Sequence, residues 1–488
     1  MTVNPAIEHA KGSEDTKNSV GGGVEAAIRR SVAVGLPVAI ADLSNLVRIP
    51  SVSWDSFDQA QVLASAEAVA ALLVGTGVFD EVVLSQAETP SGALGNPAVL
   101  ATRAAKNDRP TVLLYAHHDV QPQGDDADWL SPPFEPTLRG DRLYGRGASD
   151  DKAGIMSHVA AIRALVEGLA GADLDLGIVA FIEGEEEFGS RSFGAFLTKH
   201  RAELEADVIV VADSDNVDID TPGLTISLRG NVTFKLTVRT LEHASHSGMF
   251  GGAVPDAMLA LVRLLATLHN EDGSVAVVGL DSAPGTAPNY SEAELRRDAG
   301  LLESVTSIGR GSVNERQWFQ PAITVTGVDA PSVANASNTL LPVVSVRVSA
   351  RIAPGQDSTD AARALQEHLS AHAPFGASVE ITDVDQGDGF LVDTTGWAVK
   401  IMKGAMADGW GEVAVETGIG GSIPFISDLA RKFPAAQILV TGVEDPDTRA
   451  HSPNESQHLG VFRRAILAEA LFLARLNGGT TRELAASV

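Results

Sequence analysis

Cysteine is absent from this chain of 488 residues. The protein therefore contains no disulfide, and no thiolate can act as a nucleophile or as a metal ligand. Any metal ion that it binds must be held by histidine, aspartate and glutamate side chains.

Basic residues are scarce relative to acidic ones. The chain has 36 lysines and arginines against 63 aspartates and glutamates, which gives a net charge of −27. A chain with this balance repels nucleic acid, so we exclude nucleic acid as a partner. The acidity does not attract an anionic substrate either, so a local basic group would have to bind one.

Long apolar runs are also missing. No run reaches the length of about 18 residues that a membrane-spanning helix needs. Residues 1–23 are polar and lack the apolar core of a signal peptide. We therefore expect no membrane segment, a cytoplasmic location and a mobile N-terminal tail over residues 1–23.

Helical and strand patterns alternate in the first half of the chain. This alternation predicts an α/β fold with a mostly parallel sheet that helices cover on both faces. Helical periodicity marks residues 24–48, 59–75 and about 155–169, and apolar strands are expected at residues 98–103, 111–115, 176–182 and 208–212.

The middle of the chain follows a different order. From about residue 224 the patterns run strand, helix, strand, strand, helix, strand, which is the order of a ferredoxin-like α+β domain. We therefore predict one domain made of residues 24–220 and 386–488, with a second domain, residues 221–385, inserted into it. A long polar stretch at residues 281–318 interrupts the inserted domain.

Four predicted strands are each followed by histidine or carboxylate side chains. The carboxyl ends of strands in an open α/β sheet form the crevice where ligands bind. We therefore expect these side chains to meet in one site. They are His117, Glu186 with Glu187, Asp213, and His451, which follows a further strand at residues 437–441.

Together with Asp150, these side chains are the types that two divalent metal ions require. A dinuclear site needs about six ligand atoms and one carboxylate that bridges the ions. The ligands would be His117, Asp150, Glu187, Asp213 and His451. Asp150 is the natural bridge, because it lies in the glycine-rich segment GRGASDDKAG just before a helix.

Two further carboxylates have distinct roles beside such a site. Asp119 lies two residues from His117 and can accept a hydrogen bond from its second ring nitrogen. Glu186 is adjacent to Glu187 and is free to take a proton from water. This arrangement is what metal-assisted hydrolysis of an amide requires.

Each of these signals also has a simpler explanation. His117 and His118 could be surface-loop residues, and the acidic run at residues 183–187 could be a solvated loop. Asp150 and Asp151 could cap the following helix, for which Asp151 is well placed, and Asp213 and Asp215 could be turn residues. The joint order of the motifs and their placement at strand ends favour the metal site.

With these residues identified, the chain resembles the M20 metallopeptidase family over residues 40–475, and most closely its dipeptidase branch of carnosinase-like enzymes. The resemblance implies a catalytic domain of the zinc-peptidase type, an inserted lid and dimerisation domain, and a homodimer. The segments that carry it, in the family's order, are YAHHDVQP, LYGRGASDDKAG, EGEEEFGS, SLRG, HSGMFGG, GGSIP and AHSPNE.

The resemblance also implies which residue holds which ion. His117, Asp150 and Asp213 would bind one metal, and Asp150, Glu187 and His451 the other. Asp213 is preferred to Asp215 because it directly ends its strand and because its distance to Arg229 fits the family spacing. The family favours zinc, although Mn²⁺ or Co²⁺ suits the same ligands.

Three residues are implied in substrate binding and catalysis by the resemblance alone. His246 would reach the site of the partner subunit and stabilise the oxyanion. Arg351 would bind the substrate carboxylate with its guanidinium group, which suits a bidentate contact, and Ser422 would assist. Without the resemblance, these three could be a loop histidine, a surface arginine and a helix cap.

The function implied is hydrolysis of the amide bond in dipeptides or other short peptides. A metal-bound water would be the nucleophile and Glu186 the general base. One alternative is an N-acyl amino acid deacylase or desuccinylase of the same family, and a remote one is a non-catalytic metal-binding scaffold. Residues 386–400 lack a histidine found in carnosinase-like members, and Ile419 replaces a glutamate of some relatives, so the side-chain preference of those enzymes is not carried over.

Overall fold

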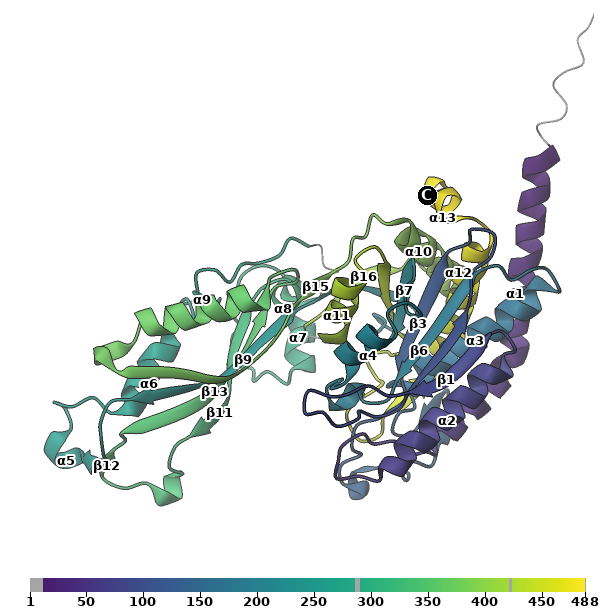
Figure 1. The fold of residues 1–488 in the computed structure, drawn as a ribbon. Coiled ribbons are helices and arrows are strands. Elements are labelled where there is room, and N and C mark those ends of the chain that lie inside the picture. The colour runs from purple at the N-terminus through teal and green to yellow at the C-terminus, as the bar shows by residue number, and fades with distance from the viewer. Residues whose placement is uncertain (1–11, 286–289, 421–423, 488) are drawn as a thin grey trace, which may run out of the picture. The chain divides into compact units, whose positions relative to one another are not determined.

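The structure is a computed structural model that describes residues 12–285, 290–420 and 424–487. The chain forms two compact units (Figure 1). Unit 1 comprises Met1–Thr225, Asp393–Val415 and Leu429–Val488, and unit 2 comprises Ile226–Val392 and Glu416–Asp428.

The sheet of unit 1 has four parallel strands at its centre. They are β6 (Gly177–Glu183), β3 (Thr111–His117), β7 (Val208–Ala212) and β17 (Gln437–Thr441), in that spatial order. β2 (Ala98–Arg103) and β1 (Glu81–Ser85) extend one edge in antiparallel fashion, and the start of β8 (Gly223–Leu228) pairs antiparallel with β17. The sheet is therefore mixed, and the expected parallel arrangement holds only at its centre.

The central strands are apolar because both faces of the sheet are covered. Every residue of β6 and β7 is buried. α3 (Lys152–Leu169) contacts β3 and β7, α1 (Gly12–Val47) and α12 (Leu459–Asn477) pack on α3, and α10 (Trp397–Trp410) packs on α12 and β17. α2 (Gln59–Gly75) contacts β1 and β2. Strands with both faces covered carry continuous apolar runs, which is why the sequence pattern located them.

α1 begins earlier than the sequence pattern indicated. Residues 12–23, expected in a mobile tail, are helical, and residues 1–11 lie outside the described part of the chain. Across the described residues, none of the helices is both long enough and apolar enough to span a membrane.

Unit 2 is built on a four-stranded antiparallel sheet of its own. The spatial order is β11 (Ala322–Asp329), β13 (Val343–Ile352), β9 (Gly230–Arg239) and β14 (Ser378–Gly387). α6 (Ala257–Ala266) and α9 (Ser358–Ala371) pack on it, so the chain order is strand, helix, strand, strand, helix, strand. Burial alternates along β13 because only one face of the sheet meets the helices.

A buried histidine joins three elements of unit 1. His158 of α3 makes a hydrogen bond of 2.8 Å through Nδ1 to Glu469 of α12, and one of 3.0 Å through Nε2 to the carbonyl oxygen of Tyr115 in β3. A carboxylate and a carbonyl both accept, so both ring nitrogens donate and the imidazole is charged. Burial by itself would lower the pKa of His158, but the charge of Glu469 and the hydrogen bonds to Glu469 and Tyr115 together outweigh it and raise the pKa above its usual value.

We predict that Glu469→Gln removes this stabilisation in a pH-dependent way. A raised pKa in the folded protein stabilises it below the unfolded value of about 6.5 and ceases to do so as the pH rises through the folded value. The wild-type melting temperature should therefore exceed that of Glu469→Gln most at low pH, and the difference should shrink above a pH of about 6.5. A difference that grows with pH would contradict this account of His158.

Candidate metal centre

The parallel strands of unit 1 bring the predicted ligands to one edge of the sheet. His117 is the last residue of β3, and Asp213 directly follows β7. Glu187 lies in η2 (Glu186–Phe188), the short 3-10 helix that comes just after β6. His451 lies in the loop between β17 and β18 (Ser456–His458). The side chains that face one another here are thus separated by up to several hundred residues of sequence.

Asp150 lies between the two histidines. One of its carboxylate oxygens is 3.2 Å from Nε2 of His117, and the other is 2.9 Å from Nε2 of His451. Nε2 of His451 is also 3.2 Å from Oε2 of Glu187. With one oxygen turned to each histidine, Asp150 has the orientation of a carboxylate that bridges two ions.

The candidate ligand atoms form two neighbouring groups. Asp150, Glu187 and His451 offer atoms within 4.8 Å of one another, and so do His117, Asp151 and Asp213. A carboxylate oxygen of Asp213 is 3.9 Å from Nε2 of His117. Distance alone therefore leaves Asp151 as an alternative to Asp150 beside His117.

The contacts of Asp151 argue against that alternative. Its Oδ2 accepts a hydrogen bond of 3.1 Å from the backbone N–H of His117. The sequence suggested that Asp151 caps α3, and it does occupy the N-cap position, but its side chain makes no capping bond. The capping role was wrong because the carboxylate turns toward β3, where it fixes the backbone of His117 instead.

Burial and the repulsion between neighbouring negative charges shift the pKa values of the carboxylates in this cluster. Burial raises the pKa of Glu187 to about 7 and that of Asp213 to about 6, and the charge of Asp150 adds to both shifts. Burial also raises the pKa of Glu186 well above its usual value. For Asp150 the hydrogen bonds from His117 and His451 overcome burial and lower its pKa.

The pKa values of His117 and His451 are raised, which favours the charged form of each ring. Hydrogen bonds to Asp150 and Glu187 raise the pKa of His451 to about 10. Burial would lower the pKa of His117, but its hydrogen bonds with Asp119 and Asp150 raise it well above its usual value. The cluster thus concentrates more negative charge than two histidines neutralise. Histidine nitrogens and carboxylate oxygens in this excess fit divalent ions such as Zn²⁺.

Asp119 is buried and anchors three groups at once. Its Oδ1 accepts from the backbone N–H of Glu186, and its Oδ2 from that of Glu187, each at 3.1 Å. Nδ1 of His117 is 3.4 Å from its carboxylate but only 3.1 Å from its backbone oxygen. Asp119 therefore orients His117 mainly through its carbonyl, while its carboxylate positions the segment that holds Glu186 and Glu187.

The structure adds supporting residues that the sequence did not suggest. The hydroxyl of Ser53 donates a hydrogen bond of 2.7 Å to Oδ2 of Asp119. Nε2 of Gln121 donates one of 2.6 Å to Oε2 of Glu187. Gln121 lies inside the segment YAHHDVQP, which could have drawn attention to it, whereas Ser53 is 66 residues from its partner and has no such signal.

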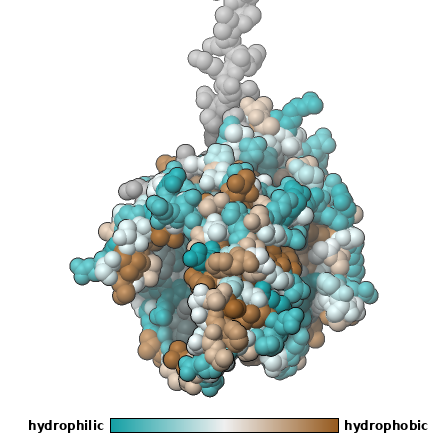
Figure 2. Space-filling model, turned by 90° about the vertical axis from the view of Figure 1, so that its left-hand side faces the viewer, coloured by the Kyte–Doolittle hydropathy of each residue, from teal (hydrophilic) through white to brown (hydrophobic). Residues whose placement is uncertain are grey.

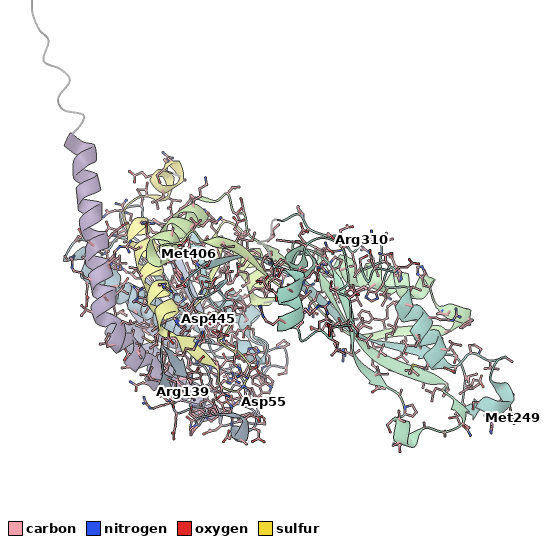
Figure 3. The ribbon with its side chains drawn as sticks, turned by 180° about the vertical axis from the view of Figure 1, so that it is seen from behind. Asp55, Arg139, Met249, Arg310, Met406 and Asp445 are labelled. Carbon is pink, nitrogen blue, oxygen red and sulfur yellow. The ribbon has the colours of Figure 1, made fainter. Side chains whose placement is uncertain are left out.

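The remaining predicted residues belong to unit 2. His246 is exposed at the end of β10 (Ser245–His246), and its Nδ1 accepts a hydrogen bond of 3.0 Å from the N–H of Gly248. In the neutral ring this leaves the proton on Nε2, ready to donate. Met249, three residues further on, is labelled at one end of unit 2 in Figure 3.

Arg351 lies on β13 of unit 2, in register with Asn231 of β9. Its charge and burial together lower the pKa of nearby Arg229 to about 10, with burial the larger cause. Two guanidinium groups are thus close together in an otherwise acidic chain. Ser422 falls outside the described residues.

We predict that Ser53→Ala weakens metal binding, because Asp119 loses the hydroxyl that fixes its carboxylate. Loss of such a supporting contact typically lowers metal affinity about 10–100-fold. Ser51→Ala is the matched control. The hydroxyl of Ser51 is equally buried and donates at 2.7 Å to the backbone of His118, without touching Asp119.

Both variants should lose about 0.5–1.5 kcal/mol of stability. Only Ser53→Ala should bind Zn²⁺ more weakly in competition with a chelator. Equal affinities in the two variants would show that Ser53 has no specific effect on the site.

Known proteins match this chain over most of its length. The model of peptidase family M20/M25/M40 matches residues 113–475. A cysteinylglycine-S-conjugate dipeptidase of Corynebacterium striatum is 34% identical over 380 residues, which cover 77% of this chain and 83% of that protein. The Cys-Gly metallodipeptidase dug1 of Schizosaccharomyces pombe is 27% identical, with coverages of 88% and 93%.

The fold matches solved structures of the same kind. The crystal structure of human carnosine dipeptidase 1 superposes with a TM-score of 0.71 at 21% identity, and the match covers 93% of this chain and 99% of that one. The resemblance to carnosinase-like dipeptidases inferred from the motifs is thereby confirmed. The chain belongs to peptidase family M20/M25/M40.

Proposed function

We propose that this protein is a dinuclear metallopeptidase that cleaves dipeptides, with zinc as its native ion. The observation that carries the proposal is Asp150, whose two carboxylate oxygens face His117 and His451. The dipeptidases among its relatives support the choice of a dipeptide over an N-acyl amino acid.

Five residues of unit 1 would hold the ions. His117, Asp150 and Asp213 would bind one ion, and Asp150, Glu187 and His451 the other. Two bound ions would polarise an amide carbonyl and lower the pKa of a metal-bound water molecule. The unusual burial of negative charge in the cluster supports this assignment, because the ions would offset it.

Glu186 would move the proton during hydrolysis. Its backbone is fixed through Asp119, and it follows the buried strand β6 without being one of the ligands. Glu186 would accept a proton from the attacking water and then return it to the nitrogen of the departing amine. A general base needs a pKa near the working pH, and burial raises that of Glu186 in this direction.

Unit 2 would supply the groups that recognise the substrate. Arg351 would bind the C-terminal carboxylate of the dipeptide in a bidentate contact, assisted by Ser422. The nearby positive charge of Arg229 supports an anion-binding role for this part of unit 2. Nε2 of His246 would donate a hydrogen bond to the oxyanion that develops on the carbonyl.

We further propose that unit 2 is a lid and dimerisation domain, and that His246 acts in the site of the partner subunit. Apolar side chains are exposed on unit 2, which suits a surface that another chain covers. They include Met249, Phe250, Leu259, Val262 and Val328. Figure 2 shows hydrophobic atoms among the hydrophilic ones on the face turned to the viewer.

We predict that Glu186→Gln keeps its metal but loses turnover by about 10²–10⁴-fold, the usual contribution of one positioned acid–base group. The assay is release of free amino acid from a panel of dipeptides, dipeptide amides and N-acyl amino acids by the metal-loaded protein. Glu203→Gln, which changes a half-exposed glutamate of the same unit, is the control. Near-normal turnover by Glu186→Gln would exclude it as the general base.

The same panel separates the substrate classes. Cleavage of N-acyl amino acids alone would assign the protein to the deacylase branch instead. If Arg351 binds the terminal carboxylate, Arg351→Met should no longer distinguish dipeptides from dipeptide amides. Arg347→Met, four residues away on the same strand, should still do so, and identical behaviour of the two variants would refute the role of Arg351.

We predict that two inactive variants, Glu186→Gln and His246→Ala, regain activity when they are mixed and allowed to exchange subunits. A mixed dimer contains one site with an intact Glu186 from one chain and an intact His246 from the other. Activity of the mixture should rise well above that of either variant alone. If exchange is demonstrated and activity stays absent, His246 does not act across subunits.

A further inference from the structure

Glu455 is a fully buried carboxylate that the ligand set and the mechanism leave unused. It lies four residues after His451 in the segment AHSPNE. Among the described residues, its hydrogen-bond partners all belong to the segment of residues 145–150. Glu455 therefore joins the loop of one proposed ligand to the loop of another.

Four N–H groups converge on its two carboxylate oxygens. Oε2 accepts from the guanidinium group of Arg146 at 2.7 Å and from the backbone of Gly147 at 3.0 Å. Oε1 accepts from the backbones of Ser149 at 2.9 Å and Asp150 at 3.1 Å. A carboxylate that receives this many donors fixes the backbone around it.

Further contacts hold the same two segments together. The backbone oxygen of Glu455 accepts from the N–H of Gly145 at 3.0 Å. The hydroxyl of Ser149 donates to Oε1 of Gln457 at 2.7 Å. Arg142 of β5 (Arg142–Tyr144) is paired with Asp445, which is labelled in unit 1 in Figure 3.

The loop of His451 requires such support. His451 and Asn454 both have positive φ, 58° and 64°, a conformation that costs free energy for residues other than glycine. Asn454 is fixed by hydrogen bonds with the backbones of Asp128 and Leu130. The loop is therefore held just after His451 by two adjacent residues, Asn454 and Glu455.

We propose that Glu455 is a positioning residue that sets the place of Asp150 relative to His451 before any metal binds. The inference rests on the metal centre proposed above. It assigns to Glu455 an effect on metal affinity that a merely structural carboxylate would lack. When the ligands are already in place, none of the free energy of metal binding is lost in ordering them.

The substitution Glu455→Gln tests this directly, because a side-chain amide cannot replace this carboxylate. All four partners are donors, so whichever oxygen the amide NH₂ replaces, two N–H groups lose their acceptor. Glu455→Asp keeps the charge but is too short to reach all four donors. We expect both variants to bind Zn²⁺ about 10–100-fold more weakly than wild type in chelator competition.

Glu469→Gln is the matched control. Glu469 is also a buried carboxylate with side-chain partners, His158 and Ser157, but it contacts none of the proposed ligands. The Glu469→Gln substitution should lower the melting temperature of the metal-free protein and leave its Zn²⁺ affinity unchanged. Wild-type affinity in folded Glu455→Gln and Glu455→Asp would overturn the proposal.

Hydrogen exchange of the wild-type protein gives a second test that needs no variant. In the metal-free protein the amides of Gly147, Ser149 and Asp150 should already be protected, because Glu455 holds them. Protection that appears only after metal is added would overturn the proposal. Failure of the wild type to bind metal at all would instead refute the proposed metal centre, so the two failures are distinguishable.

Discussion

The shared carboxylate of Asp150 is the contact on which the rest of the site depends. One oxygen faces His117 and the other faces His451, which brings two histidines 334 positions apart in the chain to a common centre. Around them, Glu186, Glu187 and Asp213 are partly buried, and the loss of solvent raises their pKa values. Such an excess of buried negative charge is costly unless cations offset it. Contacts elsewhere in the fold must offset this unfavourable free energy.

Unit 1 provides these stabilising contacts through its secondary-structure elements and buried hydrogen bonds. The parallel strands β3, β6 and β7 end at the same edge, so residues that follow them meet without long loops. Asp119 holds the segment of Glu186 and Glu187, and Glu455 holds that of Asp150. The segments that carry the proposed ligands are thus positioned by carboxylates that accept hydrogen bonds from backbone N–H groups.

The sequence predicted much of this arrangement because its signals are local. The buried strands appeared as apolar runs, and the motifs that follow them contain the proposed ligands. The family is confirmed, and the strands at residues 98–103, 208–212 and 437–441 have the predicted bounds. The antiparallel edges of the sheet were missed, because an apolar strand has the same composition in either direction. The helical character of residues 12–23 was missed because these residues carry no apolar periodicity.

Contacts between distant residues could not be predicted from patterns. Asp151 was expected to cap α3, yet its carboxylate turns to the backbone of His117, 34 positions earlier. The hydrogen bond of Ser53 with Asp119 and the clamp formed by Glu455 depend on how the chain folds back on itself. In the structure Glu416–Asp428 groups with unit 2, a division that no change in composition marks.

Metal stoichiometry tests the central claim most directly. The metal-free protein would be titrated with Zn²⁺ in a calorimeter, and the ions bound per chain would be checked by elemental analysis after dialysis. The account predicts two ions per chain for the wild type, and a loss of tight binding at both positions when Asp150 is replaced by alanine. Binding of fewer than two ions by the wild type, or two tightly bound ions in Asp150→Ala, would contradict it.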